Sequence, residues 1–306
     1  MTKTSLELAG LGEIPGDVRL RVAEKLADIE SRFGVRILYA CESGSRGWGF
    51  ASADSDYDVR FIYVHPLPWY LTVRPGRDVI ELPIDDDLDI NGWELRKALG
   101  LLAKGNPVLV EWLHSPLVYR CDEVFLDAMR ESARGLFQPG KSIHHYLHMA
   151  QGNYREYLQG DTVRLKKYLY VLRPILAARW VATKGETAPM EFSALVAGMV
   201  ADPALRRCID KLVAIKRTSG EAEYGPRFPE INAYIEAELE GLRKLAPAAA
   251  PAGDAMLDRL LLDTVLRLDQ SLLPPVALTP SAKCATDPCR DDSLWSDAPT
   301  DRDSMP

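Results

Sequence analysis

The chain has 306 residues, of which 47% are hydrophobic and 26% are charged, and its formal net charge is −7. This length allows one large domain or two smaller ones, and the hydrophobic content is enough for a sizeable core. The negative charge argues against non-specific binding of nucleic acid over the whole surface, although it leaves room for a local basic groove.

The cysteines and apolar runs indicate a reducing compartment and no membrane anchor. Five cysteines are scattered along the chain, which is not the pattern of a disulfide framework. The N-terminal residues lack the apolar run of a signal peptide, and no apolar run reaches the length of about eighteen residues that a membrane span needs. We therefore expect a cytoplasmic protein with no membrane partner.

The first part of the chain alternates helical and strand patterns. Apolar residues at helical spacing predict a helix over 16–33 that ends at Gly34. Short runs rich in β-branched and aromatic residues predict strands over 35–40, 57–64, 78–82 and 88–90. The last strand leads through Asn91-Gly92 into a predicted helix over 93–103, and a short helix over 108–113 follows. This mixture is typical of an α+β or α/β domain.

From about residue 122 the strand signals fade and helical periodicity takes over. Helices are predicted over 122–134, 142–158, 162–184, 192–199, 203–218, 228–245 and 254–271. A low-complexity linker over 246–253 precedes the last helix, and the tail from Pro274 is acidic and expected to be disordered. We therefore predict an α+β protein with a domain of mixed strands and helices over 1–120, a helical domain over 121–273 and a tail over 274–306.

A strand, a Gly-Ser turn and two alternating aspartates stand close together in the first domain. Ten residues separate Gly44-Ser45 from Asp56-x-Asp58, where the next predicted strand begins. Because side chains alternate along a strand, Asp56 and Asp58 point to the same face, where their charges repel each other. A hard divalent cation relieves this repulsion, and oxygen ligands favour Mg²⁺ or Mn²⁺ over zinc.

The turn offers groups that can hold a phosphate. Gly44 lets the backbone approach closely, the Ser45 hydroxyl and nearby amides can bind phosphate, and Arg46 adds a charge-assisted contact. Two ions held about 4 Å apart can activate an attacking hydroxyl and hold the phosphates of a nucleotide for in-line displacement. The segment therefore predicts a metal-dependent nucleotidyltransferase.

Other interpretations of these motifs are less well supported. An EF-hand that begins at Asp54 would need glycine and glutamate where the chain has Val59 and His65. A purely structural turn explains the glycine and the aspartates, but not the strands that flank them. His144 and His148 have the spacing of one helix face, but the glutamate of an HExxH metal motif is missing, which favours surface or core histidines.

The arrangement resembles the DNA-polymerase-β-like nucleotidyltransferase superfamily, whose signature is Gly-Ser, a spacer and Asp-x-Asp. Three longer stretches look like the RlaP/YcgL-type predicted nucleotidyltransferases: GSRGWGFASADSDYDVRFIYV, DINGWELRKALGLLAKGNPVLVEWLHSPLVY and KKYLYVLRPILAARW. The resemblance covers roughly residues 35–245. It implies an N-terminal mixed-sheet nucleotidyltransferase domain followed by an all-helical domain, and it suggests RNA repair as a setting and RNA as an acceptor.

The resemblance also implies a third carboxylate and contacts from the helical domain. Asp89 is our choice for the third carboxylate because it follows a β-like run and precedes a helix, and residues 85–87 are close competitors. Lys167 and Tyr170 lie on the predicted helix over 162–184 and are expected to contact the triphosphate.

The expected enzyme moves a nucleoside monophosphate from a nucleoside triphosphate to a hydroxyl acceptor and releases pyrophosphate. Asp56, Asp58 and Asp89 would bind Mg²⁺ or Mn²⁺ and act in catalysis, and residues 44–46 would hold the triphosphate. Two alternatives stay open. The chain is then either an inactive nucleotide-binding regulatory module, or an enzyme that transfers the nucleotide to a protein or a small molecule.

Overall fold

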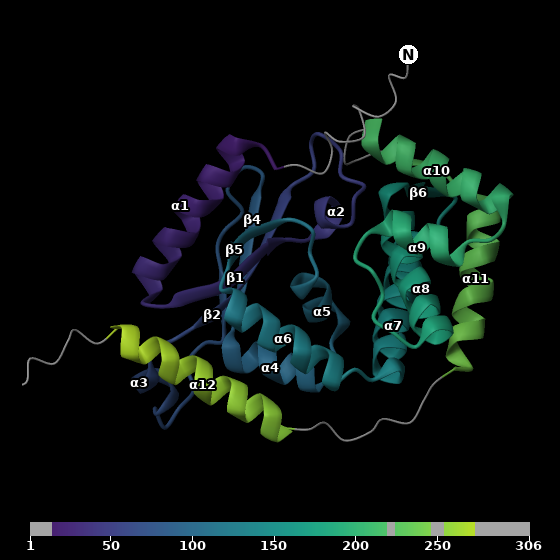
Figure 1. Ribbon diagram of the computed structural model, residues 1–306. Helices are drawn as coiled ribbons and strands as arrows, with labels where there is room; N and C mark the ends of the chain where they lie inside the picture. The colour runs from purple at the N-terminus through teal and green to yellow at the C-terminus, as the bar shows by residue number, and fades with distance from the viewer. Residues whose placement is uncertain (1–13, 219–223, 246–253, 273–306) are drawn as a thin grey trace, which may run out of the picture. The chain divides into compact units, whose positions relative to one another are not determined.

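The computed structural model describes residues 14–218, 224–245 and 254–272. These residues lie in one compact unit, which contains a five-stranded sheet, a two-stranded sheet and helices (Figure 1). The α+β class is therefore confirmed. The predicted linker over 246–253 and the predicted disordered tail over 274–306 lie outside the described residues.

The five-stranded sheet has the strand order β3-β4-β2-β1-β5. Its strands are β1 (Arg36–Glu42), β2 (Tyr57–Val64), β3 (Val79–Glu81), β4 (Leu88–Glu94) and β5 (Val118–Cys121). β2 pairs in parallel with β4, whereas the other neighbouring strands are antiparallel, so the sheet is mixed. The parallel register places Asp58 of β2 beside Asp89 of β4.

The end of β4 differs from the prediction. The strand continues through Asn91-Gly92 to Glu94, so the predicted break at this pair is wrong. Gly92 is needed for packing and not for a turn, because a Cβ atom there would overlap the ring of Phe61. Helix α4 (Leu95–Ala103) begins two residues later than predicted, and the carboxylate of Glu94 caps it by accepting bonds from two amides of its first turn.

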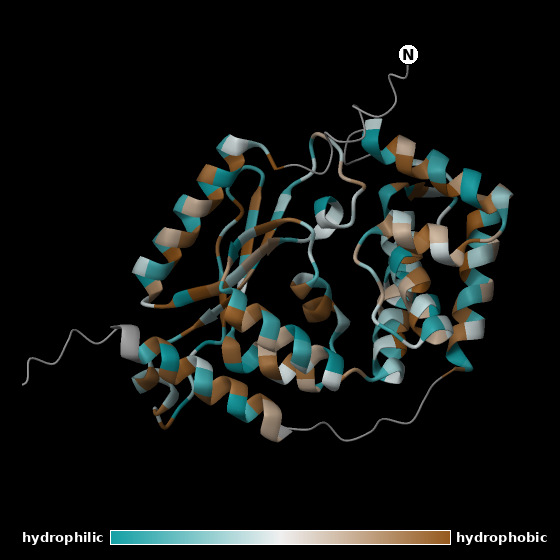
Figure 2. Ribbon diagram, viewed as in Figure 1, coloured by the Kyte–Doolittle hydropathy of each residue, from teal (hydrophilic) through white to brown (hydrophobic). Residues whose placement is uncertain are grey.

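Helices cover both faces of this sheet. Helix α1 (Gly16–Phe33) ends at the left-handed Gly34 as predicted, and its buried residues form one core with alternate residues of the strands, including Phe61. The other face is covered by α4, α5 (Pro107–Leu113), α6 (Glu123–Gly135) and α12 (Asp254–Leu272). Figure 2 shows hydrophobic residues both along the strands and in these helices. This second core draws on residues beyond 120, and the domain boundary predicted there stays a prediction.

A third core lies among the helices of the second half. Helix α8 (Lys166–Lys184) is its most buried element, and four other helices pack around it: α7 (Pro139–Tyr157), α9 (Phe192–Met199), α10 (Pro203–Thr218) and α11 (Pro229–Arg243). None of the helices in the described ranges is both long and apolar enough to cross a membrane.

This helical region also contains one short two-stranded sheet. Strand β6 (Thr162–Arg164) pairs with β7 (Tyr224–Pro226), so residues 162–164 are not the first turn of a helix as predicted. A three-residue strand is too short to show alternation, and its partner lies about sixty residues away in the chain, so local periodicity carried no signal for it.

Candidate active site

The Gly44 bend forms where β1 ends and the short helix α2 (Gly44–Gly47) begins. Gly44 has φ +55°, a left-handed backbone that glycine adopts without strain. A Cβ atom at this position would overlap the Oδ2 atom of Asp58, so this carboxylate packs directly on the bend. Ser45 is buried, with 5% of its surface exposed. The structure therefore places one predicted carboxylate against the predicted phosphate-binding turn.

Asp58 and Asp89 lie side by side on neighbouring parallel strands, and Arg60 bridges them. The Nη2 atom of Arg60 donates to Asp58 Oδ1 at 2.9 Å and to Asp89 Oδ2 at 2.7 Å. Burial raises the pKa of Asp58, the positive charge of Arg60 lowers it, and the nearby Asp89 and Asp56 raise it again. Two of the three predicted carboxylates are thus in one cluster with a partly buried cation.

The three other candidates for the third carboxylate, residues 85–87, do not share a partner with Asp58. Asp85 forms an ion pair with Lys25 at 2.7 Å, and Asp87 forms one with Arg21 at 2.9 Å, so both face helix α1. Asp86 has φ +54° and forms the turn between them. The position predicted for the third carboxylate therefore agrees with the strand register, while its catalytic role stays a prediction.

Asp56 lies in the exposed turn that precedes β2. Arg46 holds this turn, because its guanidinium donates to the carbonyls of Ser55 at 2.6 Å and Asp56 at 3.3 Å. The same guanidinium lies 3.8 Å from the centre of the Tyr57 ring. Arg46 therefore supports the backbone that carries Asp56, and its predicted contact with a triphosphate stays a prediction.

Tyr170 of α8 lies near the two aspartates. Burial raises the pKa of its phenol to about 12, and the negative charges of Asp58 and Asp56 add to this increase. The ammonium of Lys167 lies 3.8 Å from the centre of the Tyr157 ring and 5.1 Å from that of Tyr170. The helical region thus brings Tyr170 near the carboxylates, whereas Lys167 contacts the rings of Tyr157 and Tyr170, and its predicted contact with a triphosphate stays a prediction.

Lys166 is a neighbouring cation that the sequence-based assignment passed over. Burial lowers its pKa, and the positive charges of Arg164, Lys216 and Lys167 lower it further, while Asp56 raises it. Three other cations therefore act on Lys166, and Lys166 and Lys216 both interact electrostatically with Asp56, an arrangement that suits a polyanion.

Lys216 of α10 was not predicted at all. It is 4% exposed, and its ammonium donates to the hydroxyls of Ser52 at 2.6 Å and Ser55 at 3.0 Å. A lysine is almost never buried without partners, so this position has a specific task. The two serines precede Asp56 in the same loop, and the lysine therefore fixes that loop from another part of the chain.

Glu42, the last residue of β1, is a second group that sequence reasoning missed. It is fully buried, accepts a hydrogen bond from the Asp58 amide at 3.0 Å and another from the Tyr119 hydroxyl at 2.6 Å. Burial raises the pKa of this carboxyl to about 7, although both hydrogen bonds lower it. Glu42 therefore anchors the first residues of β2 to the end of β1, directly before the bend.

The residues around the bend fit one hard cation better than a cage of three carboxylates. Within the described ranges, no group of three or more His, Cys, Asp or Glu side chains is arranged to hold a metal ion. Asp58 Oδ2 on the bend, with Asp56 nearby, offers the oxygen donors that Mg²⁺ and Mn²⁺ prefer. Asp58 Oδ1 and Asp89 Oδ2 are bonded to Arg60 instead.

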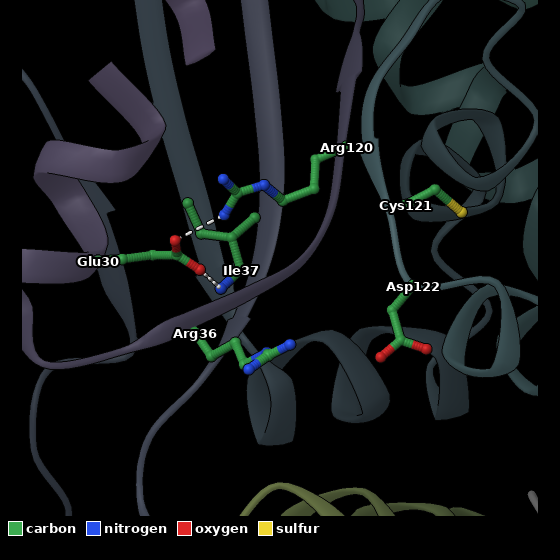
Figure 3. A pocket seen from close by; sticks show the side chains of 6 residues that line it. All are labelled: Glu30, Arg36, Ile37, Arg120, Cys121 and Asp122. Carbon is green, nitrogen blue, oxygen red and sulfur yellow. Dashed lines mark hydrogen bonds and ion pairs between the residues drawn. The ribbon is translucent and has the colours of Figure 1, made fainter. Parts of the chain in front are cut away.

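A pocket of about 510 Å³ lies at the opposite end of β1 (Figure 3). Three of its charged groups are engaged with other parts of the protein, and of these Glu30 pairs with Arg120 at 2.6 Å and accepts a bond from the Ile37 amide at 2.8 Å. Asp122 caps α6 and pairs with Arg267 at 2.8 Å. This pocket is separate from the bend, which follows the other end of the strand, and shares no residue with it.

Comparisons with known proteins agree with the sequence motifs. A family model, described as RlaP: RNA repair pathway DNA polymerase beta family, matches residues 18–263. The uncharacterized protein YcgL of Bacillus subtilis (strain 168) is 45% identical over 251 residues, which cover 81% of this chain and 96% of that protein.

Among solved structures, a nucleotidyltransferase-like protein from Exiguobacterium sibiricum 255-15 matches 78% of this chain and 74% of that chain, with 13% identity. Its TM-score is 0.26, which is too low to support a conclusion about fold or function. The family assignment depends on the family model and on the similarity to YcgL of Bacillus subtilis. On these two matches, the chain belongs to the RlaP family, the RNA repair pathway DNA polymerase beta family.

Proposed function

We propose that this protein is a metal-dependent nucleotidyltransferase that moves a nucleoside monophosphate from a nucleoside triphosphate to a hydroxyl acceptor. The observation that carries the proposal is the Asp58 carboxylate seated on the Gly44 bend, with Asp89 beside it and Asp56 near it. Membership of the RlaP family supports the same chemistry.

In the proposed reaction, an acceptor hydroxyl oxygen bonds to the α-phosphorus while the bond from that phosphorus to the bridging oxygen breaks. Pyrophosphate leaves with that oxygen. Asp56 and Asp58 would hold Mg²⁺ or Mn²⁺, an ion that neutralises phosphate charge when it is bound. Asp89, whose side chain is 32% exposed, would accept the proton of the attacking hydroxyl.

The helical region would bind the rest of the nucleotide. Lys166, which interacts electrostatically with Asp56, and Lys167, whose ammonium lies 5.1 Å from the centre of the Tyr170 ring, would face the β- and γ-phosphates. The amides of the Gly44 bend would face the α-phosphate. The first amides of a helix have no carbonyl partner within the helix, so they suit an anion.

RNA is the acceptor class to test first, with ATP as donor and the cytoplasm as the proposed location. The family description names an RNA repair pathway, and cations gather beside the carboxylates although the whole chain is acidic. A steep fall of RNA affinity with rising salt would support binding through phosphate contacts.

The experiment compares ATP labelled at the α-phosphate with ATP labelled at the γ-phosphate, in the presence of Mg²⁺ or Mn²⁺. Each is incubated with the full chain and with RNA, cell protein or small hydroxyl compounds. We expect α-label, and no γ-label, on one acceptor class. Asp56→Ala and Asp58→Ala should abolish the transfer, whereas Asp85→Ala, which removes a surface ion pair with Lys25, should not. Full activity in either active-site variant would refute the assignment.

A second candidate is a nucleotide-binding module without catalysis. The observation in its favour is that Arg60 already compensates the charges of Asp58 and Asp89. This candidate predicts saturable binding of a nucleoside triphosphate with Mg²⁺ or Mn²⁺, and no pyrophosphate release with any of the three acceptor classes.

A further inference from the structure

We propose that Arg60 takes the place of a second metal ion in this site, so that the protein binds a single divalent cation, at Asp56 and Asp58. The inference rests on the proposed function, because it describes how that site compensates its negative charges. Arg60 itself is a residue of β2 and carries no group that binds metal ions.

The position of Arg60 is fixed by the strand that carries it. Arg60 follows Asp58 by two residues on β2, so both side chains leave the same face of the sheet. The parallel register sets Asp89 beside Asp58 on that face. A cation from this position of β2 therefore reaches two carboxylates of neighbouring strands without any contribution from a loop.

Four hydrogen bonds hold the guanidinium. Nη2 donates to Asp58 Oδ1 and Asp89 Oδ2, and Nη1 donates to the carbonyls of Asp89 at 2.8 Å and Val59 at 3.1 Å. The Arg60 side chain is 17% exposed. Because an arginine stays charged at any pH that proteins tolerate, this positive charge is permanent.

A divalent cation between Asp58 and Asp89 would have to displace this guanidinium. An ion between the facing oxygens would need Asp58 Oδ1 and Asp89 Oδ2, which Arg60 now uses, and it would meet the repulsion of the guanidinium at close range. A displaced guanidinium would also lose its partners in a largely buried place, which is unfavourable for a charged group. The built-in cation is therefore the more stable arrangement for this pair.

The other oxygen of Asp58 faces a different environment. Oδ2 packs on the Gly44 bend, on the opposite side of the carboxylate from the bond to Arg60. Asp56 acts electrostatically on this same carboxylate. The two oxygens of Asp58 thus have different partners. Oδ1 is bonded to Arg60, and Oδ2 lies at the bend, where a metal ion can bind together with a phosphate.

The test counts Mn²⁺ bound to the full chain in the presence of saturating α,β-methylene-ATP, by equilibrium dialysis or by the EPR signal of free Mn²⁺. We expect one Mn²⁺ per chain for the natural protein and two for Arg60→Met, in which the carboxylates of Asp58 and Asp89 are unpaired. Arg21→Met is the matched control, because it removes the ion pair between Arg21 and Asp87, whose length of 2.9 Å is similar. The Arg21→Met protein should still bind one Mn²⁺ per chain. Two ions, or none, on the natural protein would overturn the proposal.

Two further variants keep the test decisive if Arg60→Met does not fold. Arg60→Lys retains the charge and Asp89→Asn removes one carboxylate, so each should still bind one Mn²⁺. In a two-metal site, Asp89→Asn would instead lower the count from two to one. A change of count in Arg60→Lys, or a drop from two in Asp89→Asn, would contradict the inference.

Turnover gives an independent readout. Arg60→Met should lose transfer activity at the Mn²⁺ concentration that saturates the natural protein, and it should recover at least about tenfold when Mn²⁺ is raised, because a second ion then replaces the missing charge. A purely structural role predicts no such rescue, and its absence in a folded variant would overturn the inference. If the natural protein transfers nothing to any acceptor, the proposed function fails, while the metal count still decides the role of Arg60.

Discussion

The acidic and the cationic parts of the candidate site come from regions of very different construction. Gly44, Asp56, Asp58 and Asp89 belong to one continuous stretch of chain between the end of β1 and β4. The cations around Lys166 and the ring of Tyr170 come from β6, α8 and α10, far along the sequence. The sheet fixes its carboxylates by strand register, whereas the helical region contributes through packing between distant segments.

The loop between the bend and Asp56 joins these regions. Its Phe50 is buried in the helical core, 5.5 Å from the ring of Phe192. The Phe192 amide donates to the Trp48 carbonyl at 2.9 Å, and Arg217 donates to the Gly49 carbonyl at 2.9 Å. Asp58 is therefore positioned by the sheet, whereas Asp56 is positioned by Arg46 together with the helical region. Damage to the helical region should therefore act on Asp56 more than on Asp58.

Gly44→Ala should have the largest effect among the substitutions that change the geometry of the site without unfolding the protein. The new methyl group would meet the Asp58 carboxylate, so we expect transfer activity to fall about 100-fold, as for a displacement of about 1 Å at a reacting group. Gly34→Ala is the matched control, because Gly34 has φ +60° but no neighbour within 4 Å. It should cost about 1 kcal/mol of stability and leave activity intact.

Activity assays and thermal unfolding of the two variants measure this difference. Equal losses of activity in Gly44→Ala and Gly34→Ala would mean that backbone strain, and not the contact with Asp58, is what matters at the bend.

The contribution of the helical region is tested at Lys216. Lys216→Met removes the bonds to Ser52 and Ser55, so Asp56 loses part of its support and turnover should fall about 10- to 100-fold. Lys211→Met, on an exposed position of the same helix, should have little effect. The double change Ser52→Ala with Ser55→Ala also removes the bonds between these two serines, so it should lose at least as much as Lys216→Met, and adding Lys216→Met to it should cost nothing further. Additive losses would show that the lysine acts elsewhere.

A smaller effect should distinguish the two adjacent lysines of α8. Lys166 interacts electrostatically with Asp56, whereas the ammonium of Lys167 lies over the rings of Tyr157 and Tyr170. We expect Lys166→Met to raise the KM for the nucleotide about tenfold, which is the loss of one phosphate contact, and Lys167→Met to raise it less. The reverse order in steady-state kinetics would assign the phosphate contact to Lys167, as the sequence suggested.

The smallest effect concerns the stability of the helical region in acid. Burial lowers the pKa of His145 on α7, Glu111 raises it, and the neighbouring His144 and His148 lower it. The unfolded chain therefore takes up a proton at higher pH than the folded protein, so stability falls as the pH drops below the usual histidine pKa of about 6.5. His145→Gln should make this fall less steep between pH 8 and pH 5, as measured by thermal unfolding. An unchanged slope would exclude His145 as the cause.

The sequence could predict the acidic half of the site because its geometry is local. A strand of eight residues and the period of two define the face of Asp58, and the element order points to Asp89. The same strand pattern also singles out Arg60. Arg60 is a lone charge within the otherwise apolar end of β2, on the face of Asp58, and such a residue needs a partner.

The cationic half could not be predicted in the same detail. Lys216 continues the buried face of Leu205, Ile209 and Leu212 at helical spacing, whereas Lys211 lies off that face. The periodicity therefore indicates which lysine is buried, but not which groups it contacts. Its burial depends on two serines more than 160 residues away. Gly92 illustrates the same limit within the sheet, because its packing against Phe61 outweighs the turn signal of Asn91-Gly92.

The most direct measurement is the anomalous scattering of Mn²⁺ in crystals of the full chain grown with α,β-methylene-ATP. We expect an anomalous peak within coordination distance of Asp56 and Asp58, with nucleotide phosphate oxygens completing the shell at the Gly44 bend. Nucleotide bound away from the bend, or manganese without contact to these two aspartates, would contradict the account.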